Sequence, residues 1–269
     1  VSAKFFNSKV TFDVKLSFTT EQVKESFSNV NELNGFISML ETGVKNSMTV
    51  KLDGLIMRTI NNMTGQILNS ANGLQKVNLL TEYNTASGQT LTANKALMDK
   101  DFLKFASLTI KKYQARITKM STLFNAGGKA RFTTTDNLHT VLLSDFADSA
   151  EVYLLSDTYH NDTVSLPNHE TVPYWQGSGK SYAFNDISKI DVKIDAGNKT
   201  AKQVTQTGIL GVMFDTNALG VSNLNQRTTT SYNARAEFYT NYYKMDAGYF
   251  NDLNENFVVF YIADTTPAK

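Results

Sequence analysis

The residues with the clearest chemical potential lie in a short glycine-rich segment. Residues 177–181 have the sequence Gly-Ser-Gly-Lys-Ser, which matches the end of a phosphate-binding loop. Such a loop needs Gly-x-x-x-x-Gly-Lys-Ser/Thr between a buried strand and a helix, so that backbone N–H groups can surround the phosphate. Tyr174 occupies the position of the first glycine, and no helical pattern follows. We therefore do not expect this segment to bind phosphate.

Metal ligands and nucleophiles show no convergent pattern either. The histidines are His139, His160 and His169, and none forms the i, i+4 pair that places two ligands on one helix face. The chain has no cysteine and no Gly-x-Ser-x-Gly motif around a nucleophilic serine. Carboxylates are scattered, so spacing alone assigns no acid and base pair. The sequence therefore predicts no enzymatic activity, no metal and no cofactor.

Tyrosines and phenylalanines are dense near the C-terminus, where residues 241–250 have the sequence NYYKMDAGYF. Such rings could stack on sugars or nucleotide bases. At strand spacing they more often belong to a core or to an interface, because aromatic side chains suit a half-buried sheet surface. An enzyme or a sugar-binding module stays an alternative that rests only on this aromatic face and on Trp175.

Composition limits the remaining classes. A length of 269 residues allows one large domain or two smaller ones. The 26 Lys and Arg residues nearly cancel the 25 Asp and Glu residues, which argues against a dedicated nucleic-acid-binding protein. The absence of cysteine fits synthesis in a reducing cytoplasm. No apolar run approaches the roughly 18 residues that cross a bilayer, so we expect no membrane partner.

The N-terminal third predicts a strand and a very long helix. Residues 10–18 alternate between apolar and polar side chains, as in a strand with two different faces. Thr19 and Gln22 have capping-box spacing and are expected to begin a helix. A helix over residues 29–69 would be about 60 Å long, and two helices with a break near residues 43–50 are the alternative. Its predicted apolar stripe consists of Leu33, Ile37, Leu40, Val44, Met48, Leu52, Ile56, Ile60, Met63 and Ile67.

The rest of the chain predicts a second helix, a mixed region and a sheet. Apolar spacing indicates a helix over residues 93–123, which the glycines of residues 125–130 end. Short apolar segments between polar loops then indicate a mixed α/β insertion over residues 131–202. Residues 208–263 contain three apolar or aromatic runs, at 209–214, 234–247 and 257–262, separated by polar turns. We expect these runs to form one sheet on which the rest of the chain packs.

The order of these segments resembles a known family. Near the C-terminus an apolar strand is followed by the turn Asp-x-x-Ala-Leu-Gly at residues 215–220 and by a polar stretch that contains arginine. An aromatic strand that ends in YFNDLNEN comes next, and a terminal apolar strand follows it. This order resembles the close of a tailed-bacteriophage major capsid protein, the major head protein with the Hong Kong 97-like fold, in the form found in phages of Gram-positive hosts.

The resemblance implies an α+β Hong Kong 97-like capsid fold with a long spine helix, a peripheral sheet and an inserted axial domain. Residues 1–18 resemble the returning strand of an extended loop, without the usual N-terminal arm, which implies that the true N-terminus lies upstream. Residues 19–130 resemble the spine helix and the peripheral-domain helix. Residues 131–207 resemble the axial-domain insertion, and residues 208–269 the closing peripheral-domain sheet.

The resemblance also implies a function. The chain is expected to be a structural subunit of an icosahedral phage head that self-assembles into pentamers and hexamers around double-stranded DNA. Portal and scaffolding proteins are the other implied partners, packaged DNA is contacted without sequence preference, and the protein is located in the virion after synthesis in the host cytoplasm. A flagellin-like or surface-layer subunit and an encapsulin-type compartment shell are the alternatives. Flagellin-like chains pair helices from both ends, whereas both ends here predict strands.

Three charged residues are candidates for contacts between subunits: Arg227, Arg235 and Glu237. If the aromatic strand begins at Ala234, alternation places Arg235 and Glu237 on one face of the strand and Phe238 on the other. Charges of both signs on one face suit pairing with a neighbouring copy. Solvated surface charges that contribute little are the alternative.

Overall fold

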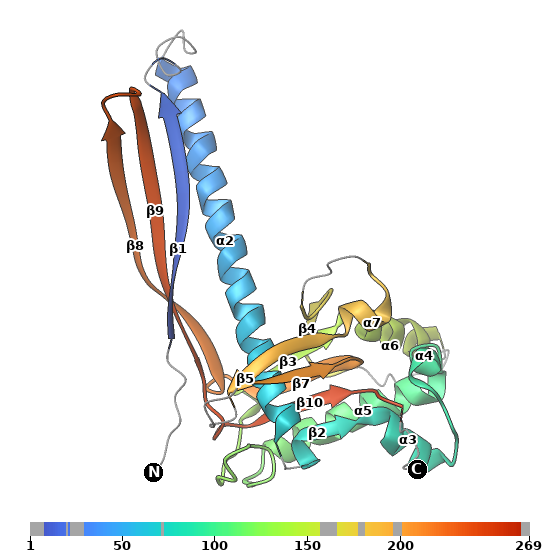
Figure 1. The fold of residues 1–269 in the computed structure, drawn as a ribbon. Helices are drawn as coiled ribbons and strands as arrows, with labels where there is room; N and C mark the ends of the chain where they lie inside the picture. Colours follow the sequence, from blue (N-terminus) through green and yellow to red (C-terminus); the bar gives the residue numbers. More distant parts are fainter. Residues whose placement is uncertain are drawn as a thin grey trace. The chain divides into compact units, whose positions relative to one another are not determined.

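The computed structural model describes residues 8–19, 21, 30–70, 73–156, 166–176, 181–195 and 201–264 (Figure 1). Contacts divide these residues into two compact units. The long-strand unit takes the described residues of Phe6–Thr59 and Gly220–Phe250. The core unit takes those of Ile60–Leu219 and Asn251–Lys269. The chain therefore leaves the core unit and returns to it near residues 219 and 251.

A three-stranded antiparallel arrangement dominates the long-strand unit. Its order is β1 (Ser8–Thr19), β9 (Phe238–Asn251) and β8 (Leu219–Asn233). Strand β1 pairs with β9 along its whole length, with Lys9 opposite Gly248 and continuous register up to Thr19. From Lys9 to Phe18, the polar side chains of β1 are exposed and its apolar side chains are half-buried. This pattern confirms the strand that the alternation in residues 10–18 predicts.

Helix α2 (Val30–Asn69) is continuous over 40 residues, which confirms the predicted long helix and shows that the alternative of two helices is wrong. At 1.5 Å per residue it is about 60 Å long. A methyl group added at Gly43 or Gly54 would meet no atom within 4 Å, so both glycines lie in open space within the helix. The helix contributes residues to both units, with the change at Ile60.

The predicted apolar stripe of α2 is only partly correct. Val44 and Met63 are buried as expected, but Ile37 is 45% exposed and Ile56 is 38% exposed. Leu55, which is 5% exposed, takes the buried position next to Ile56. The reason is geometric, because each residue turns the helix by 100° and a step of four overshoots a full turn by 40°. Repeated steps of four from Leu40 onward therefore wind around the helix.

A five-stranded sheet forms the centre of the core unit. Its order is β2 (Lys76–Asn78), β10 (Phe257–Tyr261), β7 (Ile209–Asp215), β3 (Leu138–Leu143) and β4 (Glu170–Val172). Every residue of β7 is buried, and β7 is antiparallel to both β10 and β3. A strand buried on both faces reads as a continuous apolar run, as residues 209–214 do.

Helices pack against this sheet through a shared apolar cluster. Phe102 and Ile110 of α5 belong to the same cluster as Val258 and Phe260 of β10. The helices and 3-10 turns of the core unit are η1 (Gly73–Gln75), α3 (Leu79–Ser87), α4 (Ala93–Ala96), α5 (Lys100–Ile117), η2 (Thr135–Asn137), α6 (Ser144–Ser156) and α7 (Phe184–Ile187). Strands β5 (Ile190–Asp195) and β6 (Ala201–Gln206) form a separate antiparallel pair. None of the described helices combines the length and the apolar character needed to cross a membrane.

The second predicted helix is shorter than expected at both ends. Residues 93–96 form the separate helix α4, and α5 begins only at Lys100. Asp99 sets this start, because its side chain accepts a hydrogen bond of 2.7 Å from the backbone N–H of Phe102. The helix ends at Ile117, and Met120, which the predicted helix over residues 93–123 would include, is 73% exposed.

The expected single C-terminal sheet is wrong. Strands β7 and β10 belong to the five-stranded sheet, whereas β8 and β9 belong to the three-stranded sheet. Strands β8 and β9 are 15 and 14 residues long, so they extend far beyond the polar turns that adjoin β7 and β10. The polar turns at residues 215–218 and 252–256 are thus the points where the chain changes sheets.

Candidate assembly interface

The carboxylate of Asp246 connects all three strands of the long-strand unit. Its Oδ2 atom lies 2.6 Å from Nη1 of Arg227 on β8 and 2.8 Å from Nζ of Lys9 on β1. Its Oδ1 atom accepts a hydrogen bond of 2.7 Å from the hydroxyl of Thr11, the residue opposite Asp246 in the register. The carboxylate is only 3% exposed, while the side chains of Arg227 and Lys9 are 41% and 58% exposed.

These contacts determine the charge state of Asp246. The hydrogen bond from Arg227, supported by those from Lys9 and Thr11, holds the pKa of the Asp246 carboxyl well below its usual range. A buried carboxylate with two cationic donors avoids the cost of an unpaired buried charge. The group is therefore a fixed anion that ties β8 and β1 to the central strand β9.

Other charges of both signs occupy the same face of the sheet. Lys15 and Lys244 lie 5.4 Å and 5.8 Å from the centre of the Tyr242 ring, within the range of a cation–π contact. Asp13 lies opposite Lys244 in the register. In the described part of the chain, β1 and β8 are the edge strands of this sheet, so each has one side without a strand partner. Such edges can pair with another chain.

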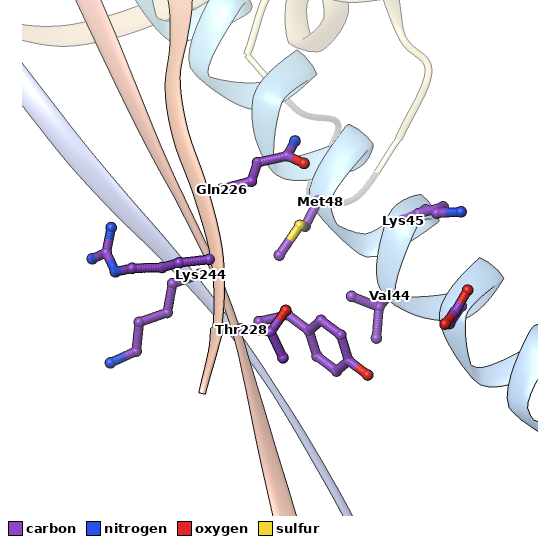
Figure 2. A pocket seen from close by; sticks show the side chains of 9 residues that line it. Val44, Lys45, Met48, Gln226, Thr228 and Lys244 are labelled. Atoms are coloured by element: carbon purple, nitrogen blue, oxygen red, sulfur yellow. The ribbon is translucent and has the colours of Figure 1, made fainter. Parts of the chain in front are cut away.

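A cavity of about 320 Å³ lies within the long-strand unit, between α2 and strands β8 and β9. Figure 2 shows Val44 and Met48 extending from the helix towards the strands. Tyr243 and the chain at Thr228 line the opposite side. Its other lining residues include carboxylate and ammonium groups, Glu41 and Lys45 on the helix and Lys244 on β9. The lining contains no histidine, serine or cysteine.

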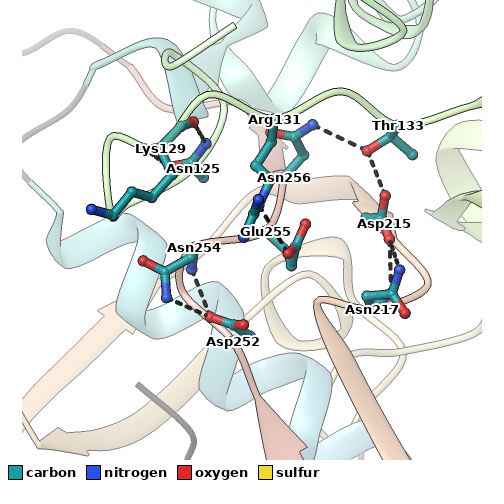
Figure 3. A network of polar contacts seen from close by, with 10 residues as sticks. All are labelled: Asn125, Lys129, Arg131, Thr133, Asp215, Asn217, Asp252, Asn254, Glu255 and Asn256. Atoms are coloured by element: carbon teal, nitrogen blue, oxygen red, sulfur yellow. Dashed lines mark hydrogen bonds and ion pairs between the residues drawn. The ribbon is translucent and has the colours of Figure 1, made fainter. Parts of the chain in front are cut away.

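Two matching turns fix the points where the chain changes sheets (Figure 3). Asp215 Oδ1 accepts hydrogen bonds from the backbone N–H and the side-chain amide of Asn217, at 2.8 Å and 3.1 Å. Asp252 Oδ1 accepts the same two bonds from Asn254, both at 2.9 Å. An Asp or Asn that binds the backbone two residues on stabilises a tight turn. The backbone N–H of Asp252 also donates to the carbonyl of Ala218 at 2.7 Å, which joins the turns.

The loop that follows α5 holds this pair of turns from one side. Thr133 donates from its hydroxyl to Asp215 Oδ2 at 2.7 Å and accepts from the side-chain amide of Asn256 at 3.1 Å. Arg131 pairs with Glu255 at 3.0 Å (Figure 3). Burial raises the pKa of the Glu255 carboxyl, and Arg131 opposes this shift. These carboxylates are therefore engaged in fixing turns.

The structure places the three predicted interface residues in two different settings. Arg227 lies on β8 and pairs with Asp246 of the same chain. Arg235 and Glu237 lie in the turn between β8 and β9, because the aromatic strand begins at Phe238 and not at Ala234. The argument from strand alternation is therefore wrong for these two residues. Both are exposed at the hairpin turn, where Glu237 has a φ of 47°. Their role in subunit contacts stays a prediction.

The other candidate residues do not converge. The ring of His139 stacks on Phe214 with 5.8 Å between ring centres, and its Nδ1 atom is 4.0 Å from Glu170. His169 Nδ1 lies 2.7 Å from the carbonyl oxygen of Pro167. Within the described ranges, no group of three His, Cys, Asp or Glu residues could hold a metal ion. His160 and residues 177–180 lie outside the described residues.

The Asp246 contacts were not found from the sequence. The sequence shows the polar positions of residues 10–18 and the aspartate within NYYKMDAGYF. It does not show that they pair, because Thr11 and Asp246 are 235 residues apart. Only the register of β1 on β9 brings the two together. A sequence signal would have been the polar face of the first strand, which needs a charged partner on the strand beside it.

Comparison with known proteins gives a consistent result. The sequence model of the Phi29-like phage major capsid protein family matches residues 1–261. No curated protein sequence matches the chain significantly. The fold is similar to the capsid structure of Staphylococcus phage Andhra, with a TM-score of 0.56 and 12% identity over 95% of this chain and 71% of that chain. It is also similar to the capsid structure of the cyanophage P-SCSP1u, with a TM-score of 0.51 and 10% identity over 98% of this chain and 74% of that chain.

The structural similarities concern the fold alone, because the identities are low. They confirm an α+β capsid fold of the Hong Kong 97 type, with its long helix and its sheets. The family match rests on the sequence and covers nearly the whole chain. This chain therefore belongs to the family of Phi29-like phage major capsid proteins.

Proposed function

We propose that copies of this chain assemble into the icosahedral shell of a phage head, as hexamers and pentamers that enclose double-stranded DNA. The observation that carries the proposal is the match of the capsid family model over residues 1–261. A shell subunit must bind copies of itself, and the edge strands β1 and β8 of the three-stranded sheet offer backbone groups for such contacts.

Within such a shell, we assign four parts to the chain. Residues 1–18 are the returning strand of an extended loop, residues 19–130 the spine helix and peripheral-domain helix, and residues 131–207 the axial-domain insertion. Residues 208–269 close the peripheral domain. The long helix α2 supports the assignment of a spine helix.

The proposed role is structural, without catalysis. The carboxylates of Asp215, Asp246 and Asp252 support this role, because each accepts hydrogen bonds that fix a turn or a sheet. We further propose that portal and scaffolding proteins bind the shell and that packaged DNA is contacted without sequence preference. The protein would be made in the host cytoplasm and reside in the virion.

Electron microscopy of the purified full chain in negative stain tests this proposal. We expect closed shells of uniform size. Filaments would contradict it and favour a flagellin-like or surface-layer subunit. Shells that package an enzyme and exclude DNA would favour an encapsulin-type compartment. A reproducible turnover that one point substitution abolishes would contradict the structural role.

A further inference from the structure

Basic residues are concentrated in one segment of the core unit. Residues 100–131 hold eight of the 26 Lys and Arg residues but only one of the 25 Asp and Glu residues, Asp101. The rest of the chain therefore has 18 basic against 24 acidic residues. The net charge of +1 for the whole chain thus conceals a strongly basic segment on an acidic background.

Helix α5 carries part of this charge on one face. Its buried residues include Phe102, Ile110 and Tyr113, which face the core. Lys112 and Arg116 are four residues apart, so at 100° per residue they lie almost one above the other, and both are exposed. Lys111 is adjacent and half-buried. The outward face of the second half of α5 is therefore basic.

The loop after α5 adds two further lysines. Ser121 and Arg131 exchange two backbone hydrogen bonds of 2.9 Å, and the N–H of Thr133 donates to the carbonyl of Ile117 at 3.0 Å. These bonds close the loop onto the C-terminal end of α5. The loop carries Lys119 and Lys129, and both are exposed. The loop therefore adds two exposed lysines next to the C-terminal end of α5.

Acidic neighbours offset only part of this charge. Arg131 is paired with Glu255. The Arg116 guanidinium lies 5.5 Å from the centre of the Tyr113 ring, and both Arg116 and Lys112 act electrostatically on Glu82 of α3. Among the described residues no salt bridge involves the three lysines 111, 119 and 129. An excess of positive charge therefore remains at the surface.

We propose that a basic ridge, formed by Lys111, Lys112, Arg116, Lys119 and Lys129, binds the phosphate backbone of double-stranded DNA. This inference rests on the proposed function, because a shell that encloses a genome brings DNA to its subunits. Within α5 the helical rise puts about 7.5 Å between residues 111 and 116, and duplex DNA presents about four phosphate charges over that distance. Contacts of this kind follow the backbone and do not select a base sequence.

Two variants of the full chain, each with three lysines replaced by glutamine, test the ridge. The ridge variant carries Lys112→Gln, Lys119→Gln and Lys129→Gln. The control variant carries Lys45→Gln, Lys95→Gln and Lys193→Gln, which remove the same charge from exposed positions elsewhere. Affinity for a random-sequence DNA duplex is measured at increasing salt concentration, and shell yield is measured in parallel by negative-stain microscopy.

We expect the ridge variant to bind DNA more weakly. The slope of log affinity against log salt concentration should become less steep by up to about 2.7, since each phosphate contact contributes about 0.9 to this slope. The control should stay close to wild type, and both variants should form shells. Equal slopes in the two variants would overturn the ridge.

An acidic scaffolding protein is the competing occupant, because Met120 and Phe132 in the same loop are exposed and interfaces between proteins use such apolar groups. Loss of shells in the ridge variant, with an unchanged salt slope, would favour that occupant and overturn DNA binding. If wild type forms no shells but the slopes differ as expected, the ridge is supported and the proposed function fails.

Discussion

Arg227 and Asp246 form an ion pair between neighbouring strands, with 2.6 Å between the guanidinium nitrogen Nη1 and the carboxylate oxygen Oδ2. Lys9, on the other flanking strand β1, approaches the same oxygen at 2.8 Å. One carboxylate thus pairs with a cation on each flanking strand. Its loss should affect both strand pairings at once.

The contribution of Asp246 to stability should depend on pH. Its pKa is lower in the folded protein than the value of about 3.9 expected in the unfolded chain. The folded state therefore binds fewer protons, so this contribution is fully present above about pH 4 and is lost as the pH falls further. Asp246→Asn should lower the melting temperature at pH 7 and should reduce its fall between about pH 5 and pH 3. Asp13→Asn, at an exposed position of β1, is the control, and equal melting of both variants at pH 7 would contradict this role.

Adjacent residues of α2 should respond differently to truncation. Leu55 is 5% exposed, so Leu55→Ala should cost about 2–5 kcal/mol of unfolding free energy. Ile56 is 38% exposed, and Ile56→Ala should cost less than about 1 kcal/mol. Urea unfolding followed by circular dichroism measures both values. Equal losses would show that the buried side of the helix has been assigned incorrectly.

Alanine substitutions at two glycines with similar φ values should distinguish the cost of backbone strain from the cost of steric overlap. Gly88 and Gly208 have φ values of 70° and 76°. A methyl group at Gly88 meets no atom within 4 Å, so Gly88→Ala should cost only the backbone strain of about 1–2 kcal/mol. A methyl group at Gly208 would overlap the carbonyl oxygen of Ile262. Gly208→Ala should therefore lower the melting temperature clearly more than Gly88→Ala, and the reverse order would contradict the placement of Gly208 against Ile262.

Charge reversal should distinguish the two settings of the predicted interface residues. Arg227→Glu puts two carboxylates side by side on β8 and β9, so it should lower the melting temperature of the isolated subunit. Arg235 lies in the exposed turn after β8, and Arg235→Glu should leave that temperature unchanged. If the turn contacts a neighbouring copy, Arg235→Glu should still reduce the yield of closed shells. Wild-type yield in this variant would identify Arg235 as solvated surface.

The elements that the sequence predicts well are those with one dominant period. The alternation from Val10 to Phe18 predicts β1, and the spacing of apolar residues over residues 29–69 predicts α2 almost to its ends. Errors arise where geometry departs from a simple repeat. The expected helix over residues 93–123 is interrupted because Asp99 caps the start of α5. In α2, Leu55 and not Ile56 is buried, because 3.6 residues per turn do not match steps of four.

Pairing between distant segments could not be predicted from local pattern. Residues 208–263 show where strands begin and end, but not which strand each one joins. The hairpin turn at residues 234–237 contains no glycine, so the sequence pattern predicts a strand over these residues. The structure instead ends β8 at Asn233 and begins β9 at Phe238. The contact of Arg227 and Lys9 with Asp246 depends on both that turn and the register of β1 on β9.

The register of β1 on β9 also constrains how a newly made chain can fold. Thr11 and Asp246 are 235 residues apart, so β1 leaves the ribosome long before its partner strand exists. During that interval β1 lacks β9, its strand partner in the described structure, and contacts of such long range are slow to form. A growing chain in this state is prone to aggregation, most of all when many copies are made together. Chaperone demand should therefore be highest before residue 249 has emerged, and a pulse of synthesis stopped short of β9 should leave β1 sensitive to protease.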